Sequence, residues 1–169
     1  MTELRTRFLA AAGAVAAAGT LAVAGLTAAT ASTSAGAARS GTEHFQLMST
    51  SATSNAESII ATGVFTAGGV DHAGNKVDRA VFPQGTFRIR HSAGTGSQRF
   101  NPRTCLGQIS LQGTYRLFDG TGKFAGIRGH GRYRLSILFV AARAHGKCVQ
   151  NKPPASFQLI IRARGPVRL

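Results

Sequence analysis

The sequence predicts an all-β protein whose mature domain is an eight-stranded antiparallel up-and-down barrel, preceded by an N-terminal signal peptide. Beyond the N-terminal segment, no window of a dozen residues has apolar residues recurring at helical spacing. Short alternating runs recur instead, between clusters of Gly, Asn, Asp and Pro. The connections are short enough for hairpins, and closing such a sheet into a barrel removes its exposed edges. A two-sheet sandwich is the alternative.

The first residues have the pattern of a secretory signal peptide. Arg5 and Arg7 precede an uncharged stretch, residues 8–26, and a run of small residues follows it. A retained membrane anchor is the alternative, but the stretch is rich in Ala and Gly, which partition weakly into hydrocarbon. Cleavage between small residues is expected after Ala31 or after Ala37.

This pattern divides the chain into two parts. Residues 1–37 are predicted to be the signal peptide and a small-residue linker, and residues 38–169 a single β-barrel domain. The second part has the length of one compact domain. The protein is therefore expected to be secreted and extracellular.

Eight alternating runs are the predicted strands. They cover residues 44–51, 57–67, 76–82, 85–91, 106–117, 125–129, 131–143 and 155–164. Turn-forming residues are concentrated at 67–75, 83–85, 92–97 and 119–122. Asp71 and His72 fall in the first of these segments, which predicts a turn for both.

The side-chain period of two sorts the predicted strands into faces. Paired arginines lie on one face of three strands, with aromatic and aliphatic residues on the other. The apolar face predicts either a core filled by its own side chains or a lumen that binds one small apolar ligand. For a lumen, the expected ligand-binding residues include Phe139 and Phe157, with Tyr115 and Tyr133 as polar groups on an apolar wall.

Cys105 and Cys148 are the two cysteines of the chain, and an even number in a secreted protein predicts a disulfide. In the chain-entropy model such a bond stabilises the fold by about 4 kcal/mol. A reactive thiol is the alternative, but neither cysteine lies in a CxxC pair or at an evident helix start.

The chain is strongly basic, with 20 Lys and Arg against 6 Asp and Glu and a formal net charge of +14. Loss of residues 1–37 lowers this charge by only one unit. Such a charge attracts polyanions, including wall polymers and anionic lipid headgroups. The alternative is a base-composition bias in the genome, because no five basic residues are consecutive. No specific nucleic-acid partner is predicted.

Familiar catalytic and metal-binding motifs are missing from the sequence. There is no GxSxG or HExxH, and the 5 His residues lack metal-ligand spacing. The Gly-rich segment 120–131 lacks the GxxxxGK[ST] spacing of a phosphate loop. The sequence predicts no metal site and no cofactor, and it identifies no catalytic residue.

The segment 120–131, "GTGKFAGIRGHG", is the densest glycine cluster of the mature chain. Glycine weakens a strand interior, so such a cluster indicates a geometric requirement. We expect these glycines to form a barrel corner, with tight bends before a long strand begins. The predicted corner residues are Gly120, Gly122, Gly126, Gly129 and Gly131.

The same segment resembles the "GGTGxFxxARG" signature of dirigent proteins and allene oxide cyclases, with Asp119 in place of the first Gly. "ATGVF" at 61–65, "VFPQGTF" at 81–87 and "GTYRLFDGTGKF" at 113–124 extend the similarity, which is greatest to the secreted actinobacterial branch and covers most of 45–164. The positions that match the signature are Gly120, Thr121, Gly122, Phe124, Arg128 and Gly129.

The resemblance implies an eight-stranded barrel, a homotrimer, and an isomerase, cyclase or stereo-directing activity that depends mostly on positioning a substrate. It implies a ligand-binding role for Arg128 if this residue faces the lumen; an exterior position is the alternative. Lys123 departs from the acidic residue common at its position in dirigent proteins, which argues against acid catalysis of their type.

Two functions therefore stay open. The first is a secreted barrel that binds a hydrophobic small molecule, a lipid or secondary metabolite, in its lumen, with or without catalysis. The second is a non-catalytic scaffold whose basic exterior associates with anionic cell-envelope polymers. We expect the first, and binding rather than catalysis.

Overall fold

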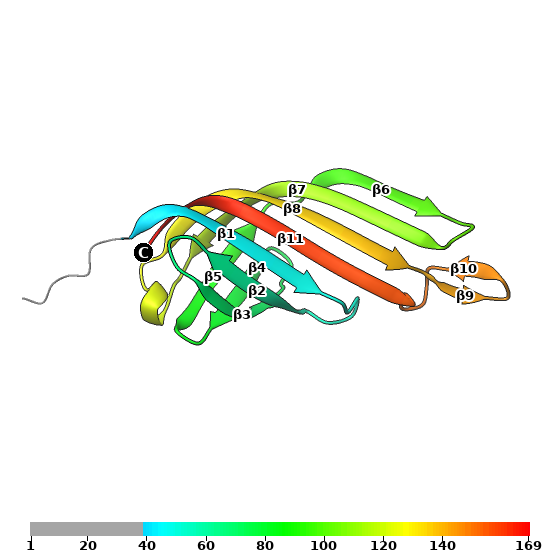
Figure 1. Cartoon of the computed structure of the whole chain (residues 1–169), viewed down its shortest axis with the longest axis horizontal. Helices are drawn as coiled ribbons and strands as arrows, with labels where there is room; N and C mark the ends of the chain where they lie inside the picture. Colours follow the sequence, from blue (N-terminus) through cyan, green and yellow to red (C-terminus); the bar gives the residue numbers. More distant parts are fainter. Residues whose placement is uncertain (1–38) are drawn as a thin grey trace, which may run out of the picture. The chain divides into compact units, whose positions relative to one another are not determined.

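The computed structural model describes residues 39–169 (Figure 1). The predicted signal peptide and its two cleavage sites lie outside these residues. The described residues form β1 (Ser40–Ser49), β2 (Ala56–Thr62), β3 (Ala67–His72), β4 (Val77–Phe82), β5 (Gly85–His91), β6 (Thr95–Asn101), β7 (Leu106–Phe118), the 3₁₀ helix η1 (Gly122–Phe124), β8 (Arg128–Val140), β9 (Ala142–Ala144), β10 (Lys147–Val149) and β11 (Ser156–Arg168).

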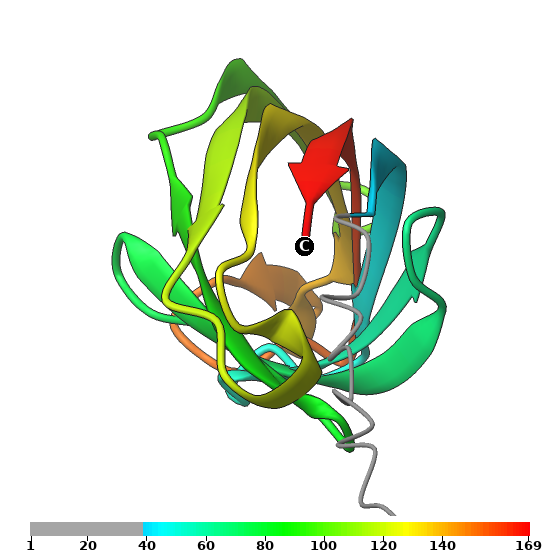
Figure 2. The same cartoon turned by 90° about the vertical axis from the view of Figure 1, so that its left-hand side faces the viewer.

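Eight of the strands close into an antiparallel barrel, which confirms the predicted fold class. Their order around the barrel is β1, β2, β3, β4, β5, β7, β8 and β11, and β11 pairs with β1 again. The pairing of β5 with β7, from Arg88↔Phe118 to His91↔Tyr115, closes the ring. Figure 2 views this ring from the end at which the C-terminus lies.

The barrel is longer on one side than on the other. Strands β7, β8 and β11 have 13 residues each, and β6 pairs with the first half of β7 while β5 pairs with the second. Residues 92–94 separate β5 from β6. In Figure 1, β6 and the far ends of the three long strands extend past β1 to β5 as an open sheet. We call this part the extension.

A disulfide joins Cys105 and Cys148, as the sequence predicts. Cys105 lies in the turn between β6 and β7, and Cys148 lies in β10, which pairs only with β9 in a separate two-stranded sheet. The bond therefore fixes the β9–β10 hairpin to the end of the extension.

Three sequence-based element assignments are wrong. Residues 67–75 and 92–97 were expected to form turns, but they contain β3 and the start of β6. Residues 125–129 were expected to form a strand of their own, but they contain the turn after η1 and the first residues of β8. In β3 one of the two glycines has a packing role: a Cβ at Gly69 would collide with the Val81 carbonyl oxygen, whereas a Cβ at Gly68 would meet nothing within 4 Å. Strand pairing overrides the low strand propensity of glycine there.

Aromatic side chains fill the end of the barrel that carries η1. Neighbouring ring centroids in this cluster are 4.9 to 6.2 Å apart, which is the range of favourable aromatic contacts. The aromatic cluster consists of Phe45, Phe65, Phe82, Phe87 and Phe124. This end of the barrel has the filled core that the sequence left open as one alternative.

The five glycines expected at one barrel corner lie in two different environments. Gly122 and Gly126 have φ angles of 59° and 84°, which a side chain rarely tolerates; Gly122 begins η1 and Gly126 follows it in the β7–β8 connection. Gly120 lies in the same connection, where the backbone of Phe124 leaves no room for a Cβ. Gly129 and Gly131 lie instead inside β8, where a Cβ would collide with β11 on one side and with a side chain of β7 on the other.

Candidate functional site

The barrel lumen contains a cavity of about 330 Å³ between the aromatic cluster and residues 92–94. Most of its wall is apolar and comes from alternate positions of strands all around the barrel. The apolar lining residues are Phe45, Leu47, Ala73, Ile89, Ala93, Leu111, Leu117, Leu135, Leu159, Ile161 and Ala163. The lumen is thus filled at one end and hollow in its middle.

Tyr115 and Tyr133 both line this cavity, where the sequence analysis expected them. Each ring lies against a glycine directly opposite on the neighbouring strand: Tyr115 pairs with Gly131, and Tyr133 pairs with Gly113. Any larger residue at either glycine would collide with the ring. The two glycines therefore position the two phenols.

The two phenols differ in their hydrogen bonds. The Tyr133 hydroxyl donates to the carbonyl oxygen of Ser92 at 3.0 Å and so holds the segment between β5 and β6. The Tyr115 hydroxyl is buried and has no partner within residues 39–169. Burial, followed by the negative charge of Glu43, raises the pKa of Tyr115 to about 12. Tyr115 therefore stays protonated at physiological pH and has a proton to donate.

Three carboxylates line one side of the same cavity, on three successive strands. Glu57 on β2 pairs across the strands with Asp71 on β3, and Asp78 follows on β4. The Asp78 carboxylate accepts a hydrogen bond from the Gly74 backbone N–H at 2.8 Å, and its Oδ1 lies 3.4 Å from Nε2 of His91 on β5. We call Glu57, Asp71 and Asp78 the acidic wall.

Two members of the acidic wall are poorly solvated. Asp71 is 1% exposed and Glu57 is 9% exposed. Burial, and then the charges of Asp78 and Glu57, raises the pKa of Asp71 to about 7. Burial and then the charge of Asp78 raise the pKa of Glu57. Near neutral pH, Asp71 therefore exchanges a proton easily, which suits either acid–base chemistry or pH-dependent binding.

The acidic wall was not predicted from the sequence, because Asp71 was expected in a turn and no carboxylate has another close to it in the sequence. Asp71 lies in β3 and faces the lumen beside Glu57. One signal was available: in "ESIIATG", Glu57 alternates with Ile59 and Ala61 on the same face, and all three are buried. Glu43 shows the same pattern with Phe45 and Leu47 and is also fully buried.

The other three residues expected to bind a ligand lie outside this cavity. Arg128 is exposed, and its guanidinium donates to the carbonyl oxygen of Ile127 at 2.9 Å. It has the outward parity of β8, opposite to Gly129 and Gly131. Phe139 and Phe157 pair with each other on β8 and β11. Since β1 ends opposite Leu159, both phenylalanines lie in the extension, beyond the cavity wall.

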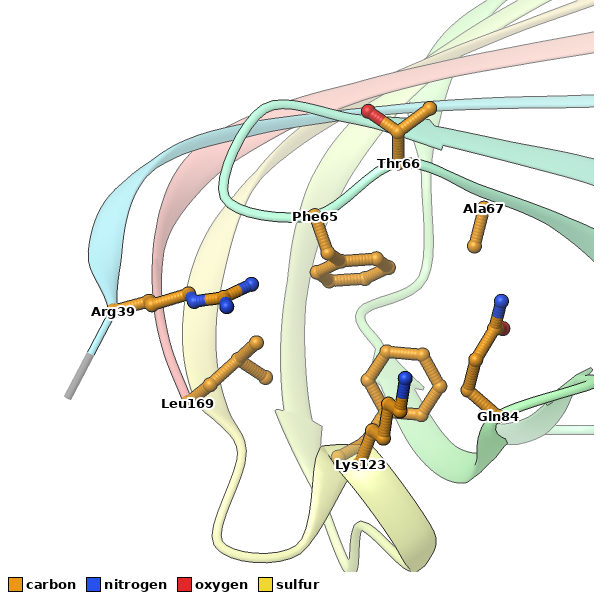
Figure 3. Close-up of a pocket in the computed structure, with 8 residues that line it drawn as sticks. Arg39, Phe65, Thr66, Ala67, Gln84, Lys123 and Leu169 are labelled. Atoms are coloured by element: carbon orange, nitrogen blue, oxygen red, sulfur yellow. The ribbon is translucent and has the colours of Figure 1, made fainter. Parts of the chain in front are cut away.

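A second hollow, of about 460 Å³, lies at the end of the barrel that carries η1. Figure 3 shows the Phe65 ring within it, with Arg39, Lys123 and Leu169 around it. Phe65 lines this hollow and Phe45 lines the lumen cavity, while their rings are 6.2 Å apart. The aromatic cluster thus separates the two spaces.

The exterior of β8 and β11 carries an arginine cluster. Arg134 pairs directly with Arg162, and Arg132 pairs with Arg164. All four arginines are exposed and line one surface groove, which β1 borders through His44 and Gln46. Like charges directly opposite on a sheet repel each other, so a bound anion would relieve strain at this surface. We call these four residues the arginine patch.

Membrane-spanning helices and metal-binding clusters are absent from the described residues. Residues 39–169 contain no helix that is long and apolar enough to cross a membrane, and no group of three His, Cys, Asp or Glu residues placed to hold a metal ion. Comparisons with protein-family models, curated proteins and solved structures gave no match.

Proposed function

We propose that this barrel binds a hydrophobic small molecule, a lipid or secondary metabolite, in its lumen. The observation that carries the proposal is the cavity of about 330 Å³ with an apolar wall and a few polar groups. Small-molecule sites in proteins have this composition, and their volumes begin near roughly 300 Å³. Tyr115 and Tyr133 are the polar groups that would orient a ligand against the aliphatic wall of β8 and β11.

We further propose membership of the allene oxide cyclase and dirigent-like superfamily, in its secreted branch. The signature residues in 120–131 and the closed eight-stranded barrel support this assignment together. The disulfide supports secretion, because such bonds persist in oxidising compartments. In this superfamily the resemblance implies a trimer and an isomerase, cyclase or stereo-directing activity that depends on orientation of the substrate.

The test is a binding titration with N-phenyl-1-naphthylamine, an uncharged apolar dye that brightens in apolar surroundings. Ala163→Phe adds a ring inside the cavity, and Ala93→Phe does so from the segment between β5 and β6. Ser136→Phe, on the exterior of β8, adds the same ring outside the barrel. We expect a loss of roughly tenfold or more in affinity for the first two variants and little change for the third.

Thermal melting of each variant controls for folding, and Ala93→Phe lies in a connection that tolerates change better than β11. A wild-type protein that does not bind the dye would contradict the proposal. Equal affinity of the wild type and a folded, filled variant would contradict it as well, since the dye would then bind elsewhere.

The arginine patch favours a second function, association of the exterior with an anionic cell-envelope polymer. Two cross-strand arginine pairs at one groove concentrate positive charge more than a solvated exterior requires. Such binding would be electrostatic and would weaken as salt rises. It is compatible with a ligand in the lumen, because the patch and the cavity lie on opposite faces of the same strands.

A further inference from the structure

We propose that the ligand of the lumen is a cation, namely a protonated organic amine with an apolar body, held by the acidic wall of Glu57, Asp71 and Asp78. This inference rests on the proposed function, because it requires a lumen that binds a small molecule. It adds the chemical class of the ligand and the residues that select it.

Acidic and basic residues are distributed differently between the lumen and the exterior. The chain has 6 acidic residues against 20 Lys and Arg, and one of the six, Glu3, lies outside the described residues. Of the other five, Asp119 alone is exposed in a turn, while Glu43 and the acidic wall occupy inward positions of strands. The exterior is thus basic and the lumen acidic. Solvation alone would place the carboxylates on the exterior as well, because burial of an unpaired charge is costly.

Two members of the acidic wall, Glu57 and Asp71, lack a counter-charge in the described chain. No Lys or Arg of residues 39–169 lines the cavity, and of the three carboxylates only Asp78 lies within ion-pair distance of His91. Oε2 of Glu57 and Oδ1 of Asp71 are buried without any hydrogen-bond donor in the described chain. Native proteins pair nearly all such oxygens, so a ligand with N–H donors and a positive charge would complete this site.

The acidic wall and the aliphatic lining of the cavity come from different strands. The carboxylates lie on β2, β3 and β4, whereas Leu135 on β8 and Leu159 and Ile161 on β11 line the same cavity from the long side of the barrel. A ligand with a cationic head toward the acidic wall and an apolar body toward β8 and β11 matches both surfaces. The carboxylates do not converge in a geometry suited to a metal ion, which favours an organic ammonium group.

The proposal predicts a pH dependence with a defined sign. The titratable groups that face the acidic wall are His91 from β5, Tyr115 from β7 and Tyr133 from β8, while β1 contributes the buried Glu43 near Tyr115. Inward side chains of β11 at the cavity are apolar. Since Asp71 gains its negative charge as pH rises through about 7, amine affinity should rise over this range. It should fall again near pH 10, where an alkylamine loses its proton.

The experiment compares three probes of equal chain length: decylamine, decanol and decanoate, each by displacement of N-phenyl-1-naphthylamine. At pH 8 the wild type should bind decylamine roughly tenfold or more tightly than decanol, and decanoate most weakly. The Glu57→Gln/Asp71→Asn double variant should lose this preference and keep its decanol affinity. Asp119→Asn, which removes an exposed carboxylate that does not line the cavity, should behave as the wild type.

The outcomes separate this inference from the proposed function. If no probe binds, the proposed lumen function fails. If decanol binds and Ala163→Phe abolishes binding, but decylamine is no better than decanol at pH 8, the lumen function stands and the cation inference is overturned. A preference that persists in the double variant also overturns it. Should that variant not fold, the ratio of amine to alcohol affinity in the wild type between pH 5.5 and 8.5 decides the matter, because a pH-independent ratio excludes a role for Asp71.

Discussion

The carboxyl group of Asp71 shows how strongly one residue depends on its surroundings. It is 1% exposed, with two other carboxylates nearby and one oxygen without a partner in the described chain. A charge in this position is unfavourable. Burial therefore raises the pKa of the Asp71 carboxyl to about 7 in the folded protein, against 3.8 in the unfolded chain. This difference makes the stability of the barrel depend on pH.

We predict that the barrel loses stability as pH rises from about 4 to about 7. In this range the folded state binds more protons than the unfolded state, so the free energy of unfolding falls with pH, by about 4 kcal/mol for Asp71 alone. Asp71→Asn should remove most of this slope. Urea unfolding without reductant at several pH values measures it, with Asp119→Asn as a control; an unchanged slope in Asp71→Asn would refute the assignment.

At the scale of the elements, the pairing of β7 with β8 determines where the phenols lie. Three aromatic residues of this pair face a glycine across the strands: Tyr115 faces Gly131, Tyr133 faces Gly113, and Phe139 faces Gly107. In each case a Cβ at the glycine would lie less than 3 Å from the ring. The glycines are needed here for space rather than for backbone freedom.

We predict that Gly131→Ala destabilises the barrel by about 2 kcal/mol and weakens dye binding. The added Cβ would lie 2.2 Å from the Arg164 carbonyl oxygen and 2.7 Å from the Tyr115 ring, so backbone and ring must both shift. Gly68→Ala is the matched control, since a Cβ at this strand glycine meets nothing within 4 Å. Urea unfolding measures both, and equal stability of the two variants would disprove the packing role of Gly131.

The elements also show where the sequence pattern fails. Strands β3 and β6 begin in segments rich in Gly, which by composition look like turns. They form strands because neighbouring strands supply hydrogen-bond partners along their whole length, and such partners come from residues distant in the sequence. The long strands β7, β8 and β11 were predictable, since their alternation is sustained over many residues.

At the scale of the whole molecule, barrel closure sorts charge by sign. The arginines of β8 and β11 that alternate with cavity-lining residues lie outside, and the acidic wall lies inside. A single layer of strands therefore separates a strongly basic exterior from an acidic lumen. The exterior can attract anions while the lumen selects against them.

We predict that the arginine patch dominates binding of linear polyphosphate, a simple anionic polymer. Arg134→Gln/Arg162→Gln should weaken binding and make the slope of log affinity against log salt shallower by about one to two units. Arg79→Gln/Arg88→Gln removes another exposed cross-strand arginine pair and the same charge, and it serves as the control. Equal losses in both double variants would show that net charge, and not the patch, attracts the polymer.

The sequence by itself determined the all-β class, the cysteine pairing and the inward direction of both tyrosines, and it favoured a closed barrel over a two-sheet sandwich. These features depend on local alternation of side chains and on the number of cysteines, which can be read along one strand at a time. The same alternation places Glu57 on the buried face of its strand beside Ile59.

Only the tertiary structure decided which inward residues meet. Glu57, Asp71, Asp78 and His91 come from four strands, and the register of three hairpins brings them to one cavity. The extension places Phe139 and Phe157 past the lumen, and the aromatic cluster fills one end of the barrel. Both features depend on the residue at which each strand pairing begins and ends. Period-two alternation gives the face of a residue, but its neighbours across a barrel depend on closure, because closure joins residues that are distant in the sequence.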